Sequence, residues 1–423
     1  MAKKKKGKWL KHLGIFGAIG IAGLIFFATN PDEEELHQLR LKKNLEQRTS
    51  IARAIGTSVR SKQFPTVIQA SVNGLKPENL EATYTLQGHL QAYAEQLLNQ
   101  YKPDYGALFM MDATTGATLA MASFEKGAPG APNLTLRGTF PAASVFKIVT
   151  ATAAVDAAGI EPHHTIYFNG GNYTLYKKNV MSDKVTKWTR AITLKDAFAR
   201  SINTAFGRLS LEKLSPHIID EYAHRFMFNQ NIPSDFSVDM GTATVPDEKS
   251  FELTEVASGY NKFNLISPVQ GAMIAASIVN DGKMVIPYIV ENLKNQKGEV
   301  VYQAAPLDNG QIMTPDSAEK VRELMEQTIL AGTSRKTFRS LVKDRRFRTI
   351  EMGGKTGHMT GTNPKGKVDW FVGYATDDEQ KIAIAALTVN KEYWTVKSSH
   401  LGQTMFRKYF EPVIQQRKIS SSK

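Results

Sequence analysis

The chain has 423 residues, of which 42% are hydrophobic and none is cysteine, and it carries a formal net charge of +13. Its length and hydrophobic content are sufficient for a globular core, and the lack of cysteine excludes disulfide frameworks and thiolate metal sites. Six of the positive charges are lysines within the first eleven residues, which leaves seven (13 − 6) for the remainder. Such a basic chain suits an anionic surface.

The amino terminus carries a membrane signal. Residues 13–29 form an uncharged apolar run of 17 residues, with lysines before it and the acidic residues 32–35 after it. This pattern predicts a cytoplasmic basic tail over 1–12, a single transmembrane anchor over 13–30, and the rest of the chain outside. A cleaved signal peptide is the alternative, but a cut after Ala28 places Phe26 where a small residue is preferred. The adjoining apolar run disfavours a nucleic-acid-binding role for the lysines.

The segment that follows begins with polar sequence. Residues 31–80 are weakly periodic and are interpreted as a linker or stalk. Apolar residues at helical spacing then predict an amphipathic helix over 86–101. Next, two strand-like runs, 105–112 and 117–123, flank a turn that ends in Gly116, which predicts a hairpin.

An Ala-rich stretch over residues 142–159 predicts a helix that ends at Gly159. Its apolar residues point in every direction, as in a helix enclosed by the rest of a domain. Ser144 and Lys147 lie within it, three residues apart and hence on one face, so the hydroxyl and the amine can meet. Burial lowers the pKa of a lysine, which makes the pair a candidate nucleophile with its base.

The remaining elements predict a mixed fold. Residues 161–190 are irregular with a turn at Gly170 and Gly171, and a second helix begins at Thr193, which has capping-box spacing to Asp196. Later patterns predict helices over 268–279, 315–330 and 403–416 and strands over 352–357, 368–375 and 381–390. We therefore expect an α+β fold in which one antiparallel sheet, built from both ends of the chain, packs against a helical part. Residues 418–423 are expected to form a tail, in which Ser420 to Lys423 are expected to be disordered.

Three short motifs carry the chemistry. They are Ser144-Val145-Phe146-Lys147, then Ser201-Ile202-Asn203 at the end of the second helix, and Lys355-Thr356-Gly357 at the end of a strand. Each alone occurs by chance in many chains. Together, and in this order, they form a recognised set.

With these motifs the chain resembles the penicillin-binding proteins, serine D,D-transpeptidases that cross-link peptidoglycan. The likeness runs from about residue 82 to 412 and includes the contexts of the motifs, among them the strand-like Asp369-Trp370-Phe371-Val372-Gly373-Tyr374. The resemblance implies the penicillin-binding and β-lactamase-like fold, with an antiparallel sheet flanked by helices and an all-α subdomain. It also places the transpeptidase domain at 81–417.

The resemblance and the chemistry assign a role to each residue. Ser144 attacks the penultimate carbonyl of the substrate, Lys147 takes its proton, and Ser201 relays that proton to the departing amine. Lys355 supplies a positive field that keeps Lys147 poised and attracts the substrate carboxylate. Asn203 is expected to bind the substrate amide and Thr356 its carboxylate, and Gly357 permits close approach of the backbone. The resemblance places the oxyanion hole at the backbone N–H groups of Ser144 and His358.

His358 departs from the family pattern, which usually has threonine or serine there. The backbone donor survives any side chain, but a hydroxyl that helps to hold the carboxylate is missing. Thr360 or Thr362 are possible substitutes, and a protonated His358 is another. Weak or unusual penicillin binding is therefore a hypothesis that rests on this position.

The sequence thus predicts a single-pass transpeptidase of the cytoplasmic membrane whose catalytic domain lies outside. Its expected partners are stem peptides ending in D-Ala-D-Ala, β-lactams as inhibitors, membrane lipid and other cell-wall synthesis proteins. Neither metal nor cofactor is expected, since no H-E-x-x-H motif occurs and nothing in the mechanism requires one. The alternatives left open are a D,D-carboxypeptidase or β-lactamase, in which water takes the acyl group, and a non-catalytic β-lactam or peptidoglycan sensor.

Overall fold

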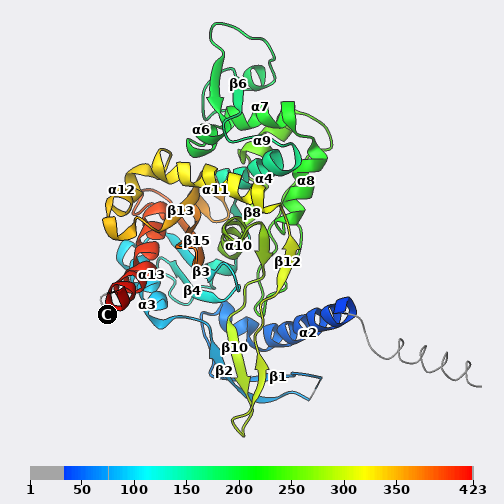
Figure 1. Cartoon of the computed structure of the whole chain (residues 1–423), viewed down its shortest axis with the longest axis vertical. Coiled ribbons are helices and arrows are strands. Elements are labelled where there is room, and N and C mark those ends of the chain that lie inside the picture. The colour runs from blue at the N-terminus through cyan, green and yellow to red at the C-terminus, as the bar shows by residue number, and fades with distance from the viewer. Residues whose placement is uncertain (1–32, 75, 422–423) are drawn as a thin grey trace, which may run out of the picture. The chain divides into compact units, whose positions relative to one another are not determined.

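The structure is a computed structural model that describes residues 33–74 and 76–421. Elements carry the labels of Figure 1. The helices are α2 (Glu33–Arg60), α3 (Gly88–Tyr101), η1 (Leu134–Leu136), η2 (Ala143–Phe146), α4 (Lys147–Thr152), η3 (Ala153–Ala157), α5 (Lys177–Val180), α6 (Leu194–Ala199), α7 (Asn203–Lys213), α8 (Pro216–Arg225), α9 (Phe251–Ser258), α10 (Pro268–Val279), α11 (Pro315–Leu330), α12 (Arg335–Lys343), η4 (Arg345–Phe347) and α13 (Ser398–Ser421).

The strands belong to one large sheet and several smaller ones. They are β1 (Val67–Ala70), β2 (Glu78–Tyr84), β3 (Tyr105–Asp112), β4 (Thr118–Glu125), β5 (Phe140–Pro141), β6 (Thr165–Phe168), β7 (Arg190–Thr193), β8 (Leu265–Ile266), β9 (Lys283–Val285), β10 (Val290–Lys294), β11 (Val300–Gln303), β12 (Asp308–Gln311), β13 (Glu351–Thr362), β14 (Lys365–Thr376) and β15 (Lys381–Asn390).

The large sheet joins both ends of the chain, as predicted. Its five strands are antiparallel in the order β13-β14-β15-β3-β4, so the early hairpin β3–β4 pairs with the late strands through β15. The turn of the hairpin contains Gly116 at φ +84°, a left-handed conformation that glycine adopts without strain. Because β13 lies at one edge of this sheet, the third sequence motif lies on an edge strand.

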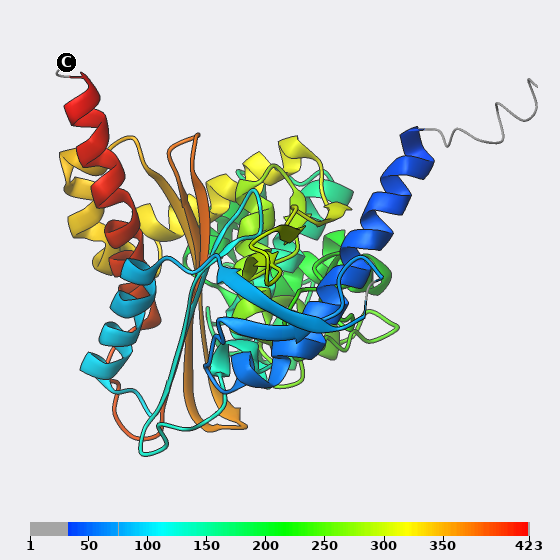
Figure 2. The same cartoon turned by 90° about the horizontal axis from the view of Figure 1, so that it is seen from below.

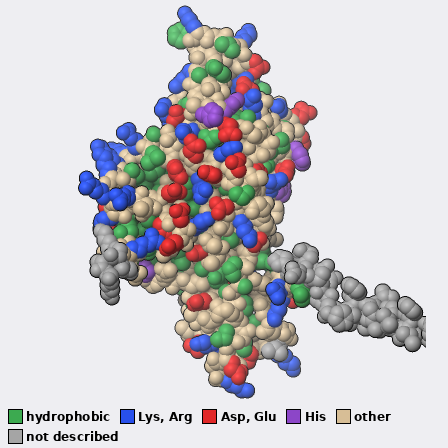
Figure 3. Space-filling view, viewed as in Figure 1, with side chains coloured by type: hydrophobic (Ala, Val, Ile, Leu, Met, Phe, Trp, Pro, Cys, Tyr) green, Lys and Arg blue, Asp and Glu red, His purple; other side chains and the backbone are tan. Residues whose placement is uncertain are grey.

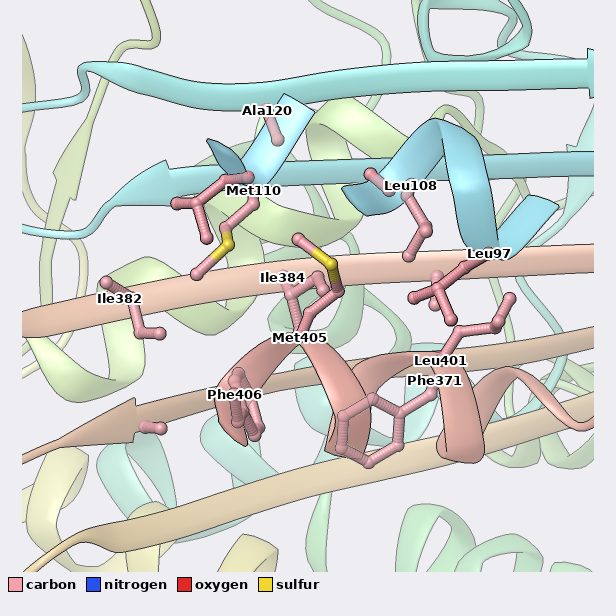
Figure 4. Close-up of a cluster of buried hydrophobic side chains, with 14 of the residues drawn as sticks. Leu97, Leu108, Met110, Ala120, Phe371, Ile382, Ile384, Leu401, Met405 and Phe406 are labelled. Carbon is pink, nitrogen blue, oxygen red and sulfur yellow. The ribbon is translucent and has the colours of Figure 1, made fainter. Parts of the chain in front are cut away.

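The two faces of the sheet are covered by different helices. Figure 2 shows α3 and α13 on one side of the sheet and the larger helical part on the other. The face covered by α3 and α13 contains a buried apolar cluster. In it, the ring centre of Phe371 from β14 lies 5.2 Å from that of Phe338 and 6.2 Å from that of Phe406. Figure 4 shows this cluster, with side chains from the hairpin, β14, β15, α3 and α13. On the opposite face, α10 packs against β3, β14 and β15.

The helical part holds the Ser144 segment. Helix α4 contacts α7, α8, α9 and α11, and all six of its residues are buried. The expectation of an enclosed helix is therefore confirmed, and Gly159 ends it at φ +62°. The helical part is not purely helical, because β6 and β7 form an antiparallel ribbon within it.

The segment interpreted as a linker has regular structure. It contains α2, β1 and β2, and β2 pairs with β10 in a four-stranded sheet. The helical period of this segment is carried by Ile51, Ile55 and Val59, which are 0% exposed and recur every four residues, as one face of a helix does. Of the described residues, 48–74 and 76–421 form one compact unit, and 33–47 fall outside it.

Two further expectations differ from the structure. The irregular segment 161–190 contains β6 and α5 and reaches β7, and α13 continues to Ser421, into the tail expected to be disordered. The predicted basic tail (1–12) and anchor (13–30) lie outside the described residues. Among the helices that the structure does describe, none combines the length and the apolar character needed to cross a membrane.

Candidate active site

Ser144 lies in the first turn of its helix. Residues 143–157 are helical throughout, but the segment changes from a 3₁₀ turn (η2) to α-helix (α4) and then to a π-helical turn (η3). Ala143, just before Ser144, has φ +48°, a conformation that costs a residue with a Cβ some free energy. Its carbonyl oxygen lies against Gly259, at φ +63°, where any Cβ would overlap it. The turn after α9 therefore fixes the backbone that presents Ser144.

Lys147 is buried and has three oxygen neighbours. Its Nζ lies 2.9 Å from Ser144 Oγ, 2.6 Å from Asn203 Oδ1 and 2.5 Å from the Ser258 carbonyl oxygen. Burial lowers the pKa of Lys147 well below its usual value, and the charge of Lys355 lowers it further. A neutral amine has two N–H groups and a lone pair. It can donate to Asn203 and Ser258 and accept the proton of the Ser144 hydroxyl, which is the arrangement a general base needs.

Lys355 forms a second lysine–serine pair. Its Nζ lies 2.9 Å from Ser201 Oγ and 2.9 Å from the Thr356 carbonyl oxygen. Lys355 is 0% exposed, and burial lowers its pKa to about 7. Burial therefore lowers the pKa of both lysines, and the charge of Lys355 adds to the lowering at Lys147. Because two nearby positive charges disfavour each other, the site can hold a neutral amine beside Ser144 and a positive charge beside Ser201.

The second motif lies at a break between helices, and not at the end of one long helix as predicted. Helix α6 begins with the expected cap, in which the Thr193 side chain accepts a hydrogen bond from the Asp196 N–H, but it ends at Ala199. Ser201 has φ +57°, a left-handed conformation that interrupts a right-handed helix, and Asn203 opens α7. The break turns Ser201 toward Lys355, while Asn203 meets Lys147 and donates from Nδ2 to the Tyr173 carbonyl oxygen at 2.6 Å.

The third motif lies on β13 and alternates between the two faces of the sheet. Lys355 and Gly357 face the Ser144 segment, and a Cβ added to Gly357 would lie 3.2 Å from the Ala142 carbonyl oxygen. Thr356 points to the other face, where its hydroxyl lies 2.6 Å from that of Thr333. Gly357 therefore allows the edge strand to approach the start of η2.

His358 faces the same side as Thr356 and has its own cluster of neighbours. Its ring packs on Trp394 at a centroid distance of 4.9 Å, and its Nδ1 lies 3.9 Å from Asp369 Oδ1 on the paired strand. Asp369 also accepts the backbone N–H of Ser398, the first residue of α13, at 2.7 Å. Burial and the nearby Lys397 and Lys367 lower the pKa of His358, although the Asp369 carboxylate opposes them, so a neutral imidazole is favoured at neutral pH.

The structure brings the predicted residues together across long stretches of sequence. One hydrogen-bonded group contains Ser144, Lys147 and Asn203, and a second contains Ser201 and Lys355. The other predicted residues continue along β13. Sequence reasoning missed four participants: the Ser258 and Tyr173 carbonyl groups and the side chains of Thr333 and Trp394. No motif marks them, because they are placed by tertiary packing. In the described part of the chain, no three His, Asp or Glu side chains gather as a metal site would require.

A nucleophilic hydroxyl beside a lysine of lowered pKa, with a second buried lysine nearby, is suited to acyl transfer. Comparison with known proteins agrees with this chemistry. The family described as penicillin binding protein transpeptidase domain matches residues 106–411. Peptidoglycan D,D-transpeptidase PbpA of Mycobacterium tuberculosis is 24% identical over 355 residues, which cover 75% of this chain and 69% of that protein. Stage V sporulation protein D of Bacillus subtilis is 22% identical over 335 residues, covering 73% and 49%.

Solved structures share the fold. The D,D-transpeptidase domain of a peptidoglycan glycosyltransferase from Eggerthella lenta superimposes with a TM-score of 0.65 at 21% identity, covering 86% of this chain and 91% of that one. Penicillin-binding protein A of M. tuberculosis, solved as an imipenem acyl-enzyme complex, gives a TM-score of 0.64 at 21% identity, covering 80% and 81%.

Proposed function

Because this chain belongs to the penicillin-binding protein transpeptidase family, we propose that it is a peptidoglycan D,D-transpeptidase that works through an acyl-enzyme at Ser144. The observation that carries the proposal is the contact of Lys147 with both Ser144 and Asn203, at 2.9 and 2.6 Å. Lys147 is 0% exposed and has a lowered pKa, so it can act as a base at a lower pH than an ordinary lysine.

The proposed reaction has two steps. In the first, Ser144 Oγ attacks the carbonyl carbon of the penultimate residue in a stem peptide ending in D-Ala-D-Ala, and its proton passes to Lys147. The C–N bond breaks, and Ser201 relays a proton to the departing D-alanine. In the second step, an amine from another peptidoglycan strand attacks the ester and releases Ser144. The backbone N–H groups of Ser144 and His358 are proposed to stabilise the oxyanion in both steps.

The substrate-binding roles are also proposals. Lys355 would hold the terminal carboxylate together with Thr356, which would reach it from the other face of this edge strand. Asn203 would hold the peptide amide, and Gly357 would allow the substrate to approach β13. A β-lactam carries an equivalent carboxylate and a strained amide, so we expect it to acylate Ser144. We further propose that residues 13–30 anchor the chain in the cytoplasmic membrane with the catalytic domain outside, which carbonate extraction of membranes would test.

Mass spectrometry of the full-length chain tests the function directly. The protein is incubated with fluorescent penicillin, and separately with a pentapeptide plus an amine acceptor. We expect a penicillin adduct on Ser144 and an amine-coupled product that lacks one D-alanine. The absence of any Ser144 adduct would refute the proposal. Turnover with water alone would favour a hydrolase, and an adduct without any turnover would favour a sensor.

Changing Gly259 to alanine is expected to slow penicillin acylation about 10- to 100-fold. The new Cβ would overlap the Ala143 carbonyl oxygen, so the backbone before Ser144 must move, and a displacement near 1 Å costs about that factor. Stopped-flow acylation measures the effect. Gly298→Ala is the matched control, since Gly298 also has positive φ (+78°) but its Cβ position is open. An equal rate loss in both variants would contradict a local effect at Ser144.

Replacing His358 with threonine is expected to raise the penicillin acylation rate about 5- to 10-fold. Threonine restores a hydroxyl that can bond the carboxylate, and one such bond contributes about 1 kcal/mol. His358→Val removes the ring without adding a hydroxyl and serves as the control. An unchanged rate in His358→Thr would show that the missing hydroxyl does not limit β-lactam recognition.

A further inference from the structure

A lobe rich in exposed aromatic side chains stands beside the active site. It comprises residues 165–193, from β6 through α5 to β7, and is called here the aromatic lobe. It projects at the top of the view in Figure 1. Nothing in the proposed reaction at Ser144 uses its outer surface.

The exposed aromatic residues of the described chain are concentrated in this lobe. Of seven strongly exposed Tyr, Trp and Phe side chains, four lie in these 29 residues, with exposed fractions from 57% to 76%: Tyr167, Tyr173, Tyr176 and Trp188. Single exposed apolar residues are ordinary, but a group on one projection indicates a binding surface. Tyr and Trp are the residues that contribute most energy to such surfaces.

The lobe is also strongly basic. It contains five exposed cations and one acid, Asp183, for a net charge of +4 (5 − 1); the cations are Lys177, Lys178, Lys184, Lys187 and Arg190. Within 33–74 and 76–421, none of these five forms an ion pair, whereas Asp183 pairs with Arg208. Lys187 Nζ lies 5.2 Å from the centre of the Trp188 ring, so charge and aromatic surface are adjacent. Figure 3 shows hydrophobic and basic side chains side by side on this projection.

The base of the lobe is bonded to the second motif. Asn203 Nδ2 donates to the Tyr173 carbonyl oxygen at 2.6 Å, and the hydroxyl of Thr204 donates to the Gly171 carbonyl oxygen at 2.5 Å. Arg190 in turn donates to Asn172 Oδ1 at 2.5 Å. The lobe that carries the exposed aromatic residues is therefore bonded directly to the residue that contacts Lys147. The lobe thus lies next to the place where the reactive end of the substrate is proposed to bind.

We propose that the aromatic lobe binds the glycan strand of peptidoglycan beyond the reacting stem peptide. The aromatic rings of the lobe pack on the apolar faces of the sugars, and its lysines lie against the carboxylates of neighbouring stem peptides. This inference rests on the proposed transpeptidase function. The combination of stacking rings and unpaired cations matches a polymer that alternates sugar faces and carboxylates. A membrane surface is the less favoured partner, because the lobe presents turns and one short helix in place of a long amphipathic one.

Co-sedimentation with insoluble peptidoglycan tests this role. The variant Tyr176→Ala/Trp188→Ala is compared with Tyr176→Phe/Trp188→Phe, which keeps a ring at both positions. We expect the alanine pair to weaken sedimentation with peptidoglycan about tenfold or more, in the range of two lost aromatic contacts, and the phenylalanine pair to bind like the wild type. Penicillin acylation at Ser144 should remain at the wild-type rate in both variants, because the small ligand does not reach the lobe.

The outcomes separate this inference from the function on which it rests. If the wild-type protein is not acylated by penicillin, the proposed function fails. If acylation is normal and the alanine pair binds peptidoglycan as the wild type does, the role of the lobe is refuted. It is refuted as well if the alanine pair loses binding to vesicles of anionic phospholipid and keeps its binding to peptidoglycan.

Discussion

Replacing Lys147 with methionine is expected to reduce the rate of acylation by penicillin about 10³-fold or more. Methionine fills a similar volume but has no lone pair to accept the Ser144 proton, and a positioned base contributes roughly 10²- to 10⁴-fold. The amine also donates to Asn203 Oδ1 and the Ser258 carbonyl oxygen, so its loss disturbs the orientation of Asn203 as well. The measurement is the second-order rate constant for labelling by fluorescent penicillin.

Two controls separate lost chemistry from lost folding. Lys195→Met removes an exposed lysine of α6 that pairs with Glu323, and it should acylate at the wild-type rate. Ser144→Ala removes the nucleophile and keeps Lys147, so a comparison of its thermal unfolding with that of Lys147→Met shows how much the other Lys147 contacts contribute to stability. Labelling of Lys147→Met at close to the wild-type rate would eliminate Lys147 as the base and direct attention to Ser201 and Lys355.

Much of the fold could be predicted because its signals are local. The hairpin β3–β4 and the helices α10 and α11 follow from turn residues, caps and apolar spacing within each segment. Helix α2 was missed because its first half is polar, and only Ile51, Ile55 and Val59 carry the helical period. The break at Ser201 could not be predicted either. Its positive φ is not a preference of serine but is imposed by the packing that brings Ser201 to Lys355.

The site was predictable only in part, for the same reason. Three motifs in a recognised order identified five polar side chains that meet in space. Nothing in the sequence, however, placed the Ser258 carbonyl beside Lys147 or Trp394 beside His358. Those contacts depend on a turn after α9 and on the loop between β15 and α13. Backbone acceptors and loop aromatics carry no spacing rule, so only the tertiary structure assigns them.

The rate of penicillin acylation is expected to depend on pH with two limbs, of which the alkaline limb reports Lys355. On the acid side the rate rises with pH, because Lys147 must lose its proton to act as a base, and its lowered pKa brings this about below the usual range of lysine. On the alkaline side Lys355, whose pKa burial lowers to about 7, loses the charge that attracts the carboxylate. Above pH 7 the rate should therefore fall by up to about tenfold per pH unit.

The alkaline limb can be assigned with one variant and one altered ligand. Lys355→Met should acylate about 10²- to 10³-fold more slowly at pH 6.5, as expected for the loss of a buried electrostatic contact, and its rate should no longer fall above pH 7. The wild-type protein with a neutral penicillin ester should also lack the alkaline limb, because the ester has no carboxylate for the Lys355 charge to attract. If the limb persists in Lys355→Met, another group titrates. If the limb is lost in Lys355→Met but persists when the wild-type protein reacts with the ester, the charge of Lys355 acts on Lys147 and Ser144 and not on the carboxylate. That result would assign Lys355 to control of the base and not to substrate binding.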